Sequence, residues 1–171
     1  MNKALLIVNA QEDFIGEQRS KDKFDYYDVD ELIININNKI EKYKADNQYV
    51  VYISHVLPSS LFNRKFVGYG ISGTYGAKIC KDIKIVCDHY FEKQTANAFK
   101  NTNLVKFMHE SEISQIEIAG IDVGGSISET ARGALDLNLK VSIENSCVGT
   151  MNEVKYNKAC TKLKNFGVAY L

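Results

Sequence analysis

Long apolar runs constrain the fold of this chain more than any other feature. Residues 4–8 form an unbroken apolar run, and residues 49–55 form a second, predominantly apolar one. Such runs indicate strands that are buried on both faces, as the strands of parallel sheets are. Further strands are predicted at residues 83–87 with a continuation ending at 92–93, at 116–119, at 141–143 and at 168–171.

Helical patterns lie between these strands. Apolar residues follow the three-four spacing of one helix face from Val29 to Tyr43. More helices are predicted at 102–109, from residue 127 onward and at 152–166, with Gly167 as the stop of the last one. The alternation of strands and helices predicts one α/β domain over residues 1–171. We expect a mostly parallel six-stranded sheet with helices on both faces.

Polar residues stand where several of these strands end. Asn9, His55 and Lys93 each follow or finish an apolar run. In open parallel sheets, ligands bind beyond the carboxyl ends of the strands, where the strand order reverses. With the order 3-2-1-4-5-6, that crevice lies between the first strand and the strand ending at Ala119. Asn9 and Ser126 are then expected to face each other across it.

The segment after Ala119 reads as a strand, a turn at Gly124 and Gly125, and the start of a helix. Helix-start N–H groups lack intrahelical partners, so the N–H groups of Gly125 and Ser126 are expected to form an oxyanion hole. Ser126 lies where a nucleophile would stand. The alternative is that Ser126 only caps the helix, with Glu129 three residues later completing a capping box.

The charge balance excludes several classes of partner. Lysines and arginines number 21, as do aspartates and glutamates, so no net field recruits nucleic acid or an anionic membrane. No apolar stretch approaches the roughly 20 residues that a transmembrane helix needs. The first residues lead straight into a strand rather than a signal peptide, which predicts a cytoplasmic protein.

Neither a metal site nor a disulfide framework is predicted. The cysteines at 80, 87, 147 and 160 are far apart and show no CxxC spacing, which indicates reduced thiols in a cytosolic setting. The histidines at 55, 89 and 109 are also unclustered. We therefore expect no metal and no cofactor.

Three segments carry a family resemblance. Residues 4–14, residues 91–93 followed by 97–99, and residues 120–131 resemble, in order and spacing, the signature segments of the isochorismatase-like cysteine hydrolases, which include nicotinamidases. The resemblance implies a Rossmann-like three-layer α/β/α domain and an Asp–Lys–Cys triad that hydrolyses small cyclic amides, imides or an enol ether. It also implies a homo-oligomer and a non-trans peptide near the Gly-Gly turn. The metal motif of nicotinamidases is not visible around His55, which argues against that activity.

Only one residue of that triad is retained. Lys93 matches, whereas Asn9 stands at the aspartate position and Ser126 at the cysteine position. A serine hydroxyl needs a base to take its proton, and Lys93 can be that base if burial lowers its pKa. One hypothesis is thus a divergent hydrolase acting on a small amide, imide or ester. The alternatives are a catalytically inactive member that binds a small molecule, or an active enzyme whose Asp and Cys were replaced by mutagenesis.

Substrate contacts are expected from both sides of the crevice. The long segment 57–79 is glycine-rich with interspersed aromatic residues, and such connections are often lids or binding loops. Its aromatic side chains either stack on a planar ligand or anchor the loop, and Arg64 and Lys65 can meet an anionic group. The predicted substrate-binding residues are Gln11, Phe14, Tyr75, Gly124 and Gly125.

Overall fold

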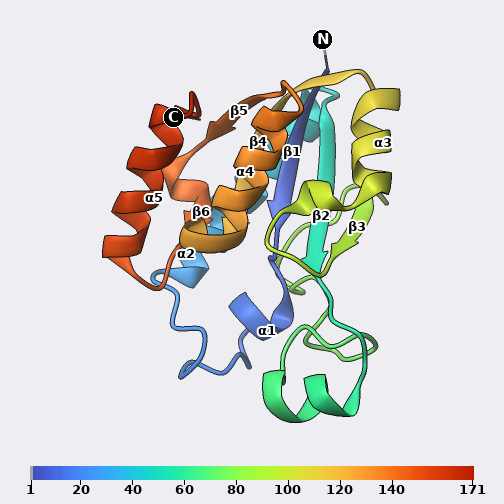
Figure 1. Ribbon diagram of the computed structural model, residues 1–171, viewed down its shortest axis with the longest axis vertical. Coiled ribbons are helices and arrows are strands. Elements are labelled where there is room, and N and C mark those ends of the chain that lie inside the picture. Colours follow the sequence, from blue (N-terminus) through green and yellow to red (C-terminus); the bar gives the residue numbers. More distant parts are fainter. Residues whose placement is uncertain (1) are drawn as a thin grey trace.

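The computed structural model describes residues 2–171 and shows an α/β fold with three layers (Figure 1). The strands are β1 Asn2–Val8, β2 Tyr49–His55, β3 Tyr90–Lys93, β4 Ile113–Ile121, β5 Lys140–Ile143, β6 Val148–Gly149 and β7 Ala169–Tyr170. The α-helices are α1 Glu12–Ile15, α2 Val29–Ala45, α3 Thr102–Glu110, α4 Ser128–Asp136 and α5 Glu153–Asn165. Short 3-10 or π-helical turns are η1 Asn63–Val67, η2 Ala98–Lys100, η3 Val123–Ile127 and η4 Asn145–Cys147.

The sheet has the predicted order with one addition. Its strands run β3-β2-β1-β4-β5-β7, and every pair is parallel. This path confirms the order 3-2-1-4-5-6 for the six predicted strands. The two-residue strand β6 also pairs with β4 and makes a seventh strand, which the sequence reading missed.

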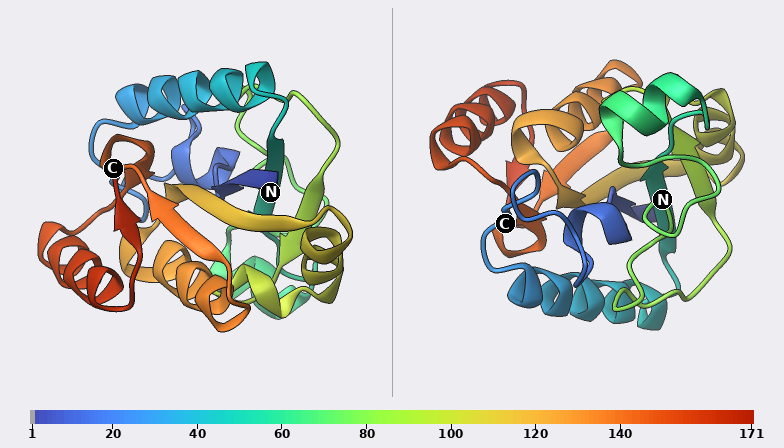
Figure 2. Two further views of the ribbon diagram at one scale, coloured as in Figure 1. Left: turned by 90° about the horizontal axis from the view of Figure 1, so that it is seen from above. Right: turned by 90° about the horizontal axis from the view of Figure 1, so that it is seen from below.

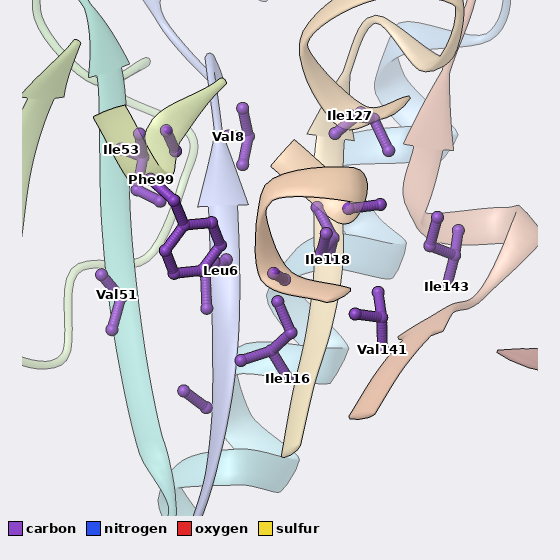
Figure 3. Close-up of a cluster of buried hydrophobic side chains, with 14 of the residues drawn as sticks. Leu6, Val8, Val51, Ile53, Phe99, Ile116, Ile118, Ile127, Val141 and Ile143 are labelled. Atoms are coloured by element: carbon purple, nitrogen blue, oxygen red, sulfur yellow. The ribbon is translucent and has the colours of Figure 1, made fainter. Parts of the chain in front are cut away.

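Helices cover both faces of the sheet. α2 lies on one face, and α3, α4 and α5 lie on the other (Figure 2). Strands β1 and β4 alternate between two apolar clusters, so Leu5 and Ile7 pack toward α2 while Leu6 and Val8 pack toward α3 and α4. Figure 3 shows the cluster on the side of α3 and α4, in which Ile127 and Phe99 lie over the central strands. Burial on both faces explains the unbroken apolar runs.

The predicted strand at residues 83–87 is wrong. These residues form a loop, and the edge strand β3 begins only at Tyr90. The side chain of Tyr52 takes the place of a neighbouring strand, because its hydroxyl accepts from Val86 N–H at 3.1 Å and donates to the Lys84 carbonyl at 2.7 Å. The Cys87 thiol also donates to the Val50 carbonyl at 3.0 Å. Side-chain groups thus satisfy backbone that would otherwise need a ladder.

No helix in residues 2–171 is long and apolar enough to cross a membrane.

The face of the sheet that α2 covers carries a buried carboxylate. Glu117 on β4 pairs with Lys39 at 2.8 Å and accepts from the Tyr43 hydroxyl at 2.9 Å, and Lys39 also pairs with Glu144. A buried carboxylate is tolerated only with such partners.

Gly120 allows the two central strands to meet closely. It has φ +113° and lies opposite Val8 in the β1–β4 register. A Cβ at this position would stand 2.0 Å from the Val8 carbonyl oxygen, so any side chain would push the strands apart. The carboxyl ends of β1 and β4 therefore remain adjacent only with glycine here.

We expect Gly120→Ala to lower the free energy of unfolding by about 3 kcal/mol or more, because it adds a backbone clash to an unfavourable φ. Gly73→Ala is the matched control, since Gly73 has φ +80° but nothing within 4 Å of its Cβ position. That control should lose only about 1–2 kcal/mol. Urea denaturation measures both values, and equal losses would contradict the close approach of β1 and β4.

Candidate active site

The residues predicted for the triad come from three separate elements at the carboxyl edge of the sheet. Asn9 directly follows β1 and has φ +55°, a left-handed conformation that asparagine tolerates better than most residues. Lys93 is the last residue of β3, and Ser126 lies in the turn η3 that follows β4. The β2–β3 register places Lys93 beside His55. Sheet order alone therefore brings distant parts of the sequence together.

Hydrogen bonds join these three side chains. Asn9 Nδ2 donates to Ser126 Oγ at 3.0 Å, and Lys93 Nζ donates to the same oxygen at 3.0 Å. Lys93 Nζ also donates to the Thr95 carbonyl at 3.1 Å. Lys93 is only 4% exposed and Asn9 only 8%, whereas Ser126 is half-buried. The structure thus gathers the three residues around one hydroxyl oxygen, that of a half-buried serine.

The turn η3 explains why Ser126 faces inward. The Asp122 side chain accepts from Gly124 N–H at 2.6 Å and begins the turn, and Ile127 at its end is fully buried in the cluster of Figure 3. Ser126 is therefore fixed from both sides. The capping-box alternative is not what the structure shows, because the Ser126 hydroxyl meets Asn9 and Lys93, and Glu129 pairs with Arg132.

The expected oxyanion hole needs a correction at Gly125. Its N–H donates to the Asp122 carbonyl at 3.1 Å and is not free for a ligand. The non-trans peptide lies at Ile121–Asp122, just before the Gly-Gly turn rather than within it. Gly124 remains exposed at the rim of the turn.

Burial alone sets the electrostatics of Lys93. Desolvation lowers the pKa of Lys93 from its ordinary value of 10.5 to about 8, because a charged amine loses its hydration there. No ion pair found in residues 2–171 includes Lys93. Desolvation, followed by the neighbouring Lys93 charge, lowers the pKa of His55 to about 4, so His55 is neutral near pH 7. The centre therefore holds a cation without an anionic partner.

Gln11 is built into the scaffold beside this centre. It is fully buried, and its Nε2 donates to the carbonyls of His55 at 3.0 Å and Ala77 at 2.8 Å. Its Oε1 accepts from His55 N–H at 2.6 Å. The amide therefore holds the end of β1 against the end of β2, and both of its N–H donors are used within the protein.

The two aromatic residues predicted to contact substrate occupy different surroundings. Phe14 is buried, with its ring centroid 4.9 Å from that of Phe24 and 5.7 Å from that of Tyr69. Tyr75 is 58% exposed, and its hydroxyl donates to Glu12 at 2.9 Å. Phe14 thus holds the segment 57–79 against the core through its contact with Tyr69, and Tyr75 presents its ring to solvent. Neither Phe14 nor Tyr75 forms a hydrogen bond with Asn9, Lys93 or Ser126.

The burial of Lys93 lowers the free energy of unfolding while its amine is charged. Because the folded protein binds the Lys93 proton less tightly than the unfolded chain, the stability of the native protein rises as the pH rises from about 8 to 10.5. We expect Lys93→Met to be more stable than the native protein by about 1–3 kcal/mol below pH 8, after the two lost hydrogen bonds are allowed for. This advantage should vanish by about pH 10.5.

Urea denaturation across this pH range measures the difference in the free energy of unfolding between the native protein and Lys93→Met. Lys100→Met is the control, since Lys100 is exposed and should change stability little at any pH. A Lys93→Met advantage that is absent at pH 7, or that does not depend on pH, would show that Lys93 is not a desolvated amine.

Solved structures share this fold over almost the whole chain. A nicotinamidase/pyrazinamidase from Bacillus subtilis matches with a TM-score of 0.84 and 21% identity, covering 99% of each chain. An N-carbamoylsarcosine amidase from Thermoplasma acidophilum matches with a TM-score of 0.83 and 20% identity over 99% of this chain and 95% of that one. An isochorismatase-like hydrolase from Alkaliphilus metalliredigens gives 0.86 and 18%, over 99% and 94%.

A pyrazinamidase of Pyrococcus horikoshii, solved in complex with zinc, has a TM-score of 0.85 and 19% identity over 100% of this chain and 99% of that one. The residues of the present chain do not fit a comparable metal centre. Nowhere in residues 2–171 do three or more His, Cys, Asp or Glu side chains gather as ligands. His55, which ends β2, lies instead beside the cationic Lys93.

No curated protein sequence matches the chain significantly. The family model of the isochorismatase domain, however, matches residues 3–171, which is nearly the full length. This match agrees with the sheet order and with the similar structures. The chain belongs to the isochorismatase family.

Proposed function

We propose that this protein is a divergent isochorismatase-family hydrolase that cleaves a small amide, imide or ester, with Ser126 as nucleophile and Lys93 as general base. The observation that carries the proposal is the 3.0 Å hydrogen bond between Lys93 Nζ and Ser126 Oγ inside a desolvated site. A nucleophile and a base within hydrogen-bond reach are the minimum requirement for covalent catalysis by serine. Lys93 thereby takes over the proton transfer that Asn9 cannot perform.

Desolvation makes Lys93 suitable as a base. With its pKa lowered from 10.5 to about 8, the neutral fraction at pH 7 rises roughly 300-fold, to about a tenth of the molecules. The Thr95 carbonyl holds one N–H of the amine, so the lone pair of the neutral form can face Ser126. Asn9 Nδ2 fixes the position of Ser126 Oγ.

The reaction then follows from these positions. Neutral Lys93 takes the Ser126 proton while Oγ attacks the carbonyl carbon, and the Lys93 ammonium returns that proton to the leaving nitrogen or oxygen. Lys93 then takes a proton from water, whose oxygen attacks the acyl-serine. As the ester bond to Ser126 Oγ breaks, the Lys93 ammonium returns that proton to Oγ, and a carboxylic acid is released. Assembly into a homo-oligomer, a cytoplasmic location and the absence of a cofactor belong to the same proposal, on the strength of family resemblance and composition.

We expect Ser126→Ala and Lys93→Met each to lower kcat/KM on a responsive ester or amide by about 10³-fold, within the range of positioned acid–base catalysis. The double variant should be no worse than either single variant, because both residues serve one step. Activity should rise with pH and level off above about 8, where Lys93 is neutral. Lys93→Arg should be as inactive as Lys93→Met, since a guanidinium does not give up its proton.

Steady-state kinetics on a panel of small esters, amides and imides measure these effects, and mass spectrometry should find an acyl group on Ser126. Lys140→Met, a change of an exposed lysine on β5, is the matched control and should keep full activity. Native activity that survives Ser126→Ala would overturn the serine mechanism. Binding without turnover, with hydrolysis gained only after Asn9→Asp with Ser126→Cys, would instead establish an inactive binding protein.

A further inference from the structure

The centre around Ser126 leaves several polar groups without a hydrogen-bond partner. The Lys93 ammonium has three N–H donors, of which Ser126 Oγ and the Thr95 carbonyl take two. Ser126 Oγ accepts from both Lys93 and Asn9, and no bond in the structure uses the proton of Ser126 itself. One N–H of Lys93 and the O–H of Ser126 are therefore left over beside one buried acceptor, Asn9 Oδ1. Two converging donors fit an oxygen anion better than any neutral group.

The charge of the centre leads to the same conclusion. β2 contributes the neutral His55 and β1 the neutral Asn9, so neither strand offers Lys93 a negative charge. A cavity beyond Thr95 is lined by the exposed Glu92 and Lys100, which carry one charge of each sign. A buried cation without a counter-charge is costly, and a bound anion relieves that cost.

Asn9 is the residue responsible for this imbalance. Its Nδ2 and Lys93 Nζ each lie 3.0 Å from Ser126 Oγ, so the two nitrogens are separated by no more than twice that distance. A carboxylate at position 9 would thus be close enough to neutralise the ammonium. With asparagine at this position, the protein supplies no such charge, and the ammonium form is left for an anionic ligand to neutralise.

We propose that the protonated Lys93 and the Ser126 hydroxyl form a binding site for a small carboxylate, and that this anion is the acid product of the hydrolysis. The site itself follows from the geometry, whereas its identification as a product site rests on the proposed function. In the last step, water oxygen has entered the acyl group and the bond to Ser126 Oγ has broken. The new carboxylic acid then gives its proton to Lys93 Nζ, which leaves an ammonium and a carboxylate side by side.

This arrangement makes release of the product dependent on pH. The carboxylate stabilises the ammonium form, and the ammonium form cannot act as a base. Product therefore inhibits most strongly at low pH, and deprotonation of Lys93 both frees the anion and restores the base. Because His55 titrates near pH 4, it does not change its charge between pH 6.5 and 9.5.

Isothermal titration calorimetry with benzoate and acetate tests the site directly, with benzyl alcohol and isopropanol as uncharged probes that have no cleavable bond and no carbonyl group. Benzoate affinity should fall about 30-fold between pH 6.5 and pH 9.5, as expected for a site that requires the ammonium form of a group titrating at about 8. Binding at pH 9 should take up protons from the buffer. The uncharged probes should show no pH dependence.

Variants separate this site from nonspecific binding. Lys93→Met should lose benzoate binding at both pH values, and Asn9→Asp should weaken it at least ten-fold at pH 6.5. Lys93→Arg should bind benzoate equally at both pH values, because its charge persists. Lys140→Met, a change of an exposed lysine on β5, should behave as the native protein does. Benzoate binding that survives Lys93→Met, or that is the same at pH 6.5 and 9.5 in the native protein, would overturn the proposal.

The experiment does not depend on turnover. A protein that binds benzoate with proton uptake but hydrolyses nothing would support the anion site and refute the proposed enzyme. Turnover without pH-dependent benzoate binding would refute the anion site alone. Competitive inhibition by benzoate that strengthens as the pH falls would support both.

Discussion

The close contact between β1 and β4 is the constraint on which the rest of the structure depends. These strands are neighbours in the sheet although more than a hundred residues separate them in the chain, and Gly120 lets the end of β4 pass against the Val8 carbonyl. Connections leave this point in opposite directions, one toward β2 and β3 and the other toward β5 and β7. The crevice at such a reversal is where open α/β sheets bind ligands. Asn9 and Ser126 lie just beyond it.

Lys93 reaches the same point from the edge of the sheet, and its burial gives the centre its chemistry. Desolvation acts on a cation for which the surrounding protein supplies no anion, so the neutral amine becomes accessible near physiological pH. Asn9, which shares Ser126 Oγ with Lys93, carries no charge and cannot serve as the counter-charge of the lysine. The proposed roles of Lys93 as a base and as an anion receptor both rest on this missing charge.

The sequence was most informative where burial is continuous. Strands β1, β2 and β4 were predicted to within a few residues because both of their faces are covered, and the family signature located Asn9, Lys93 and Ser126. The strand predicted at residues 83–87 was wrong because their backbone bonds the Tyr52 hydroxyl and not a neighbouring strand. The spacing of apolar residues does not reveal such a contact. The two-residue strand β6 is too short to leave a pattern.

Within the site, tertiary contacts decided what local patterns left open. The sequence around Ser126 fits both a helix cap and a nucleophile, and only the contacts from β1 and β3 show that the hydroxyl meets Asn9 and Lys93 instead of capping the helix. Likewise, no local feature shows that the Gln11 amide donates to the carbonyls of His55 and Ala77. The same holds for the hydrogen bond from the Gly125 N–H to the Asp122 carbonyl. The catalytic and binding roles of these residues remain predictions.

The central claim is that Lys93 is a desolvated amine without a counter-charge, and its own titration tests that claim most directly. NMR of protein labelled with ¹³C at the lysine ε-carbon can follow this group across the pH range, with Lys93→Met identifying its signal. The account predicts a pKa of about 8 in the native protein and a higher value in Asn9→Asp, where a carboxylate stabilises the ammonium. A native Lys93 that titrates near 10.5, or a value unchanged by Asn9→Asp, would contradict it.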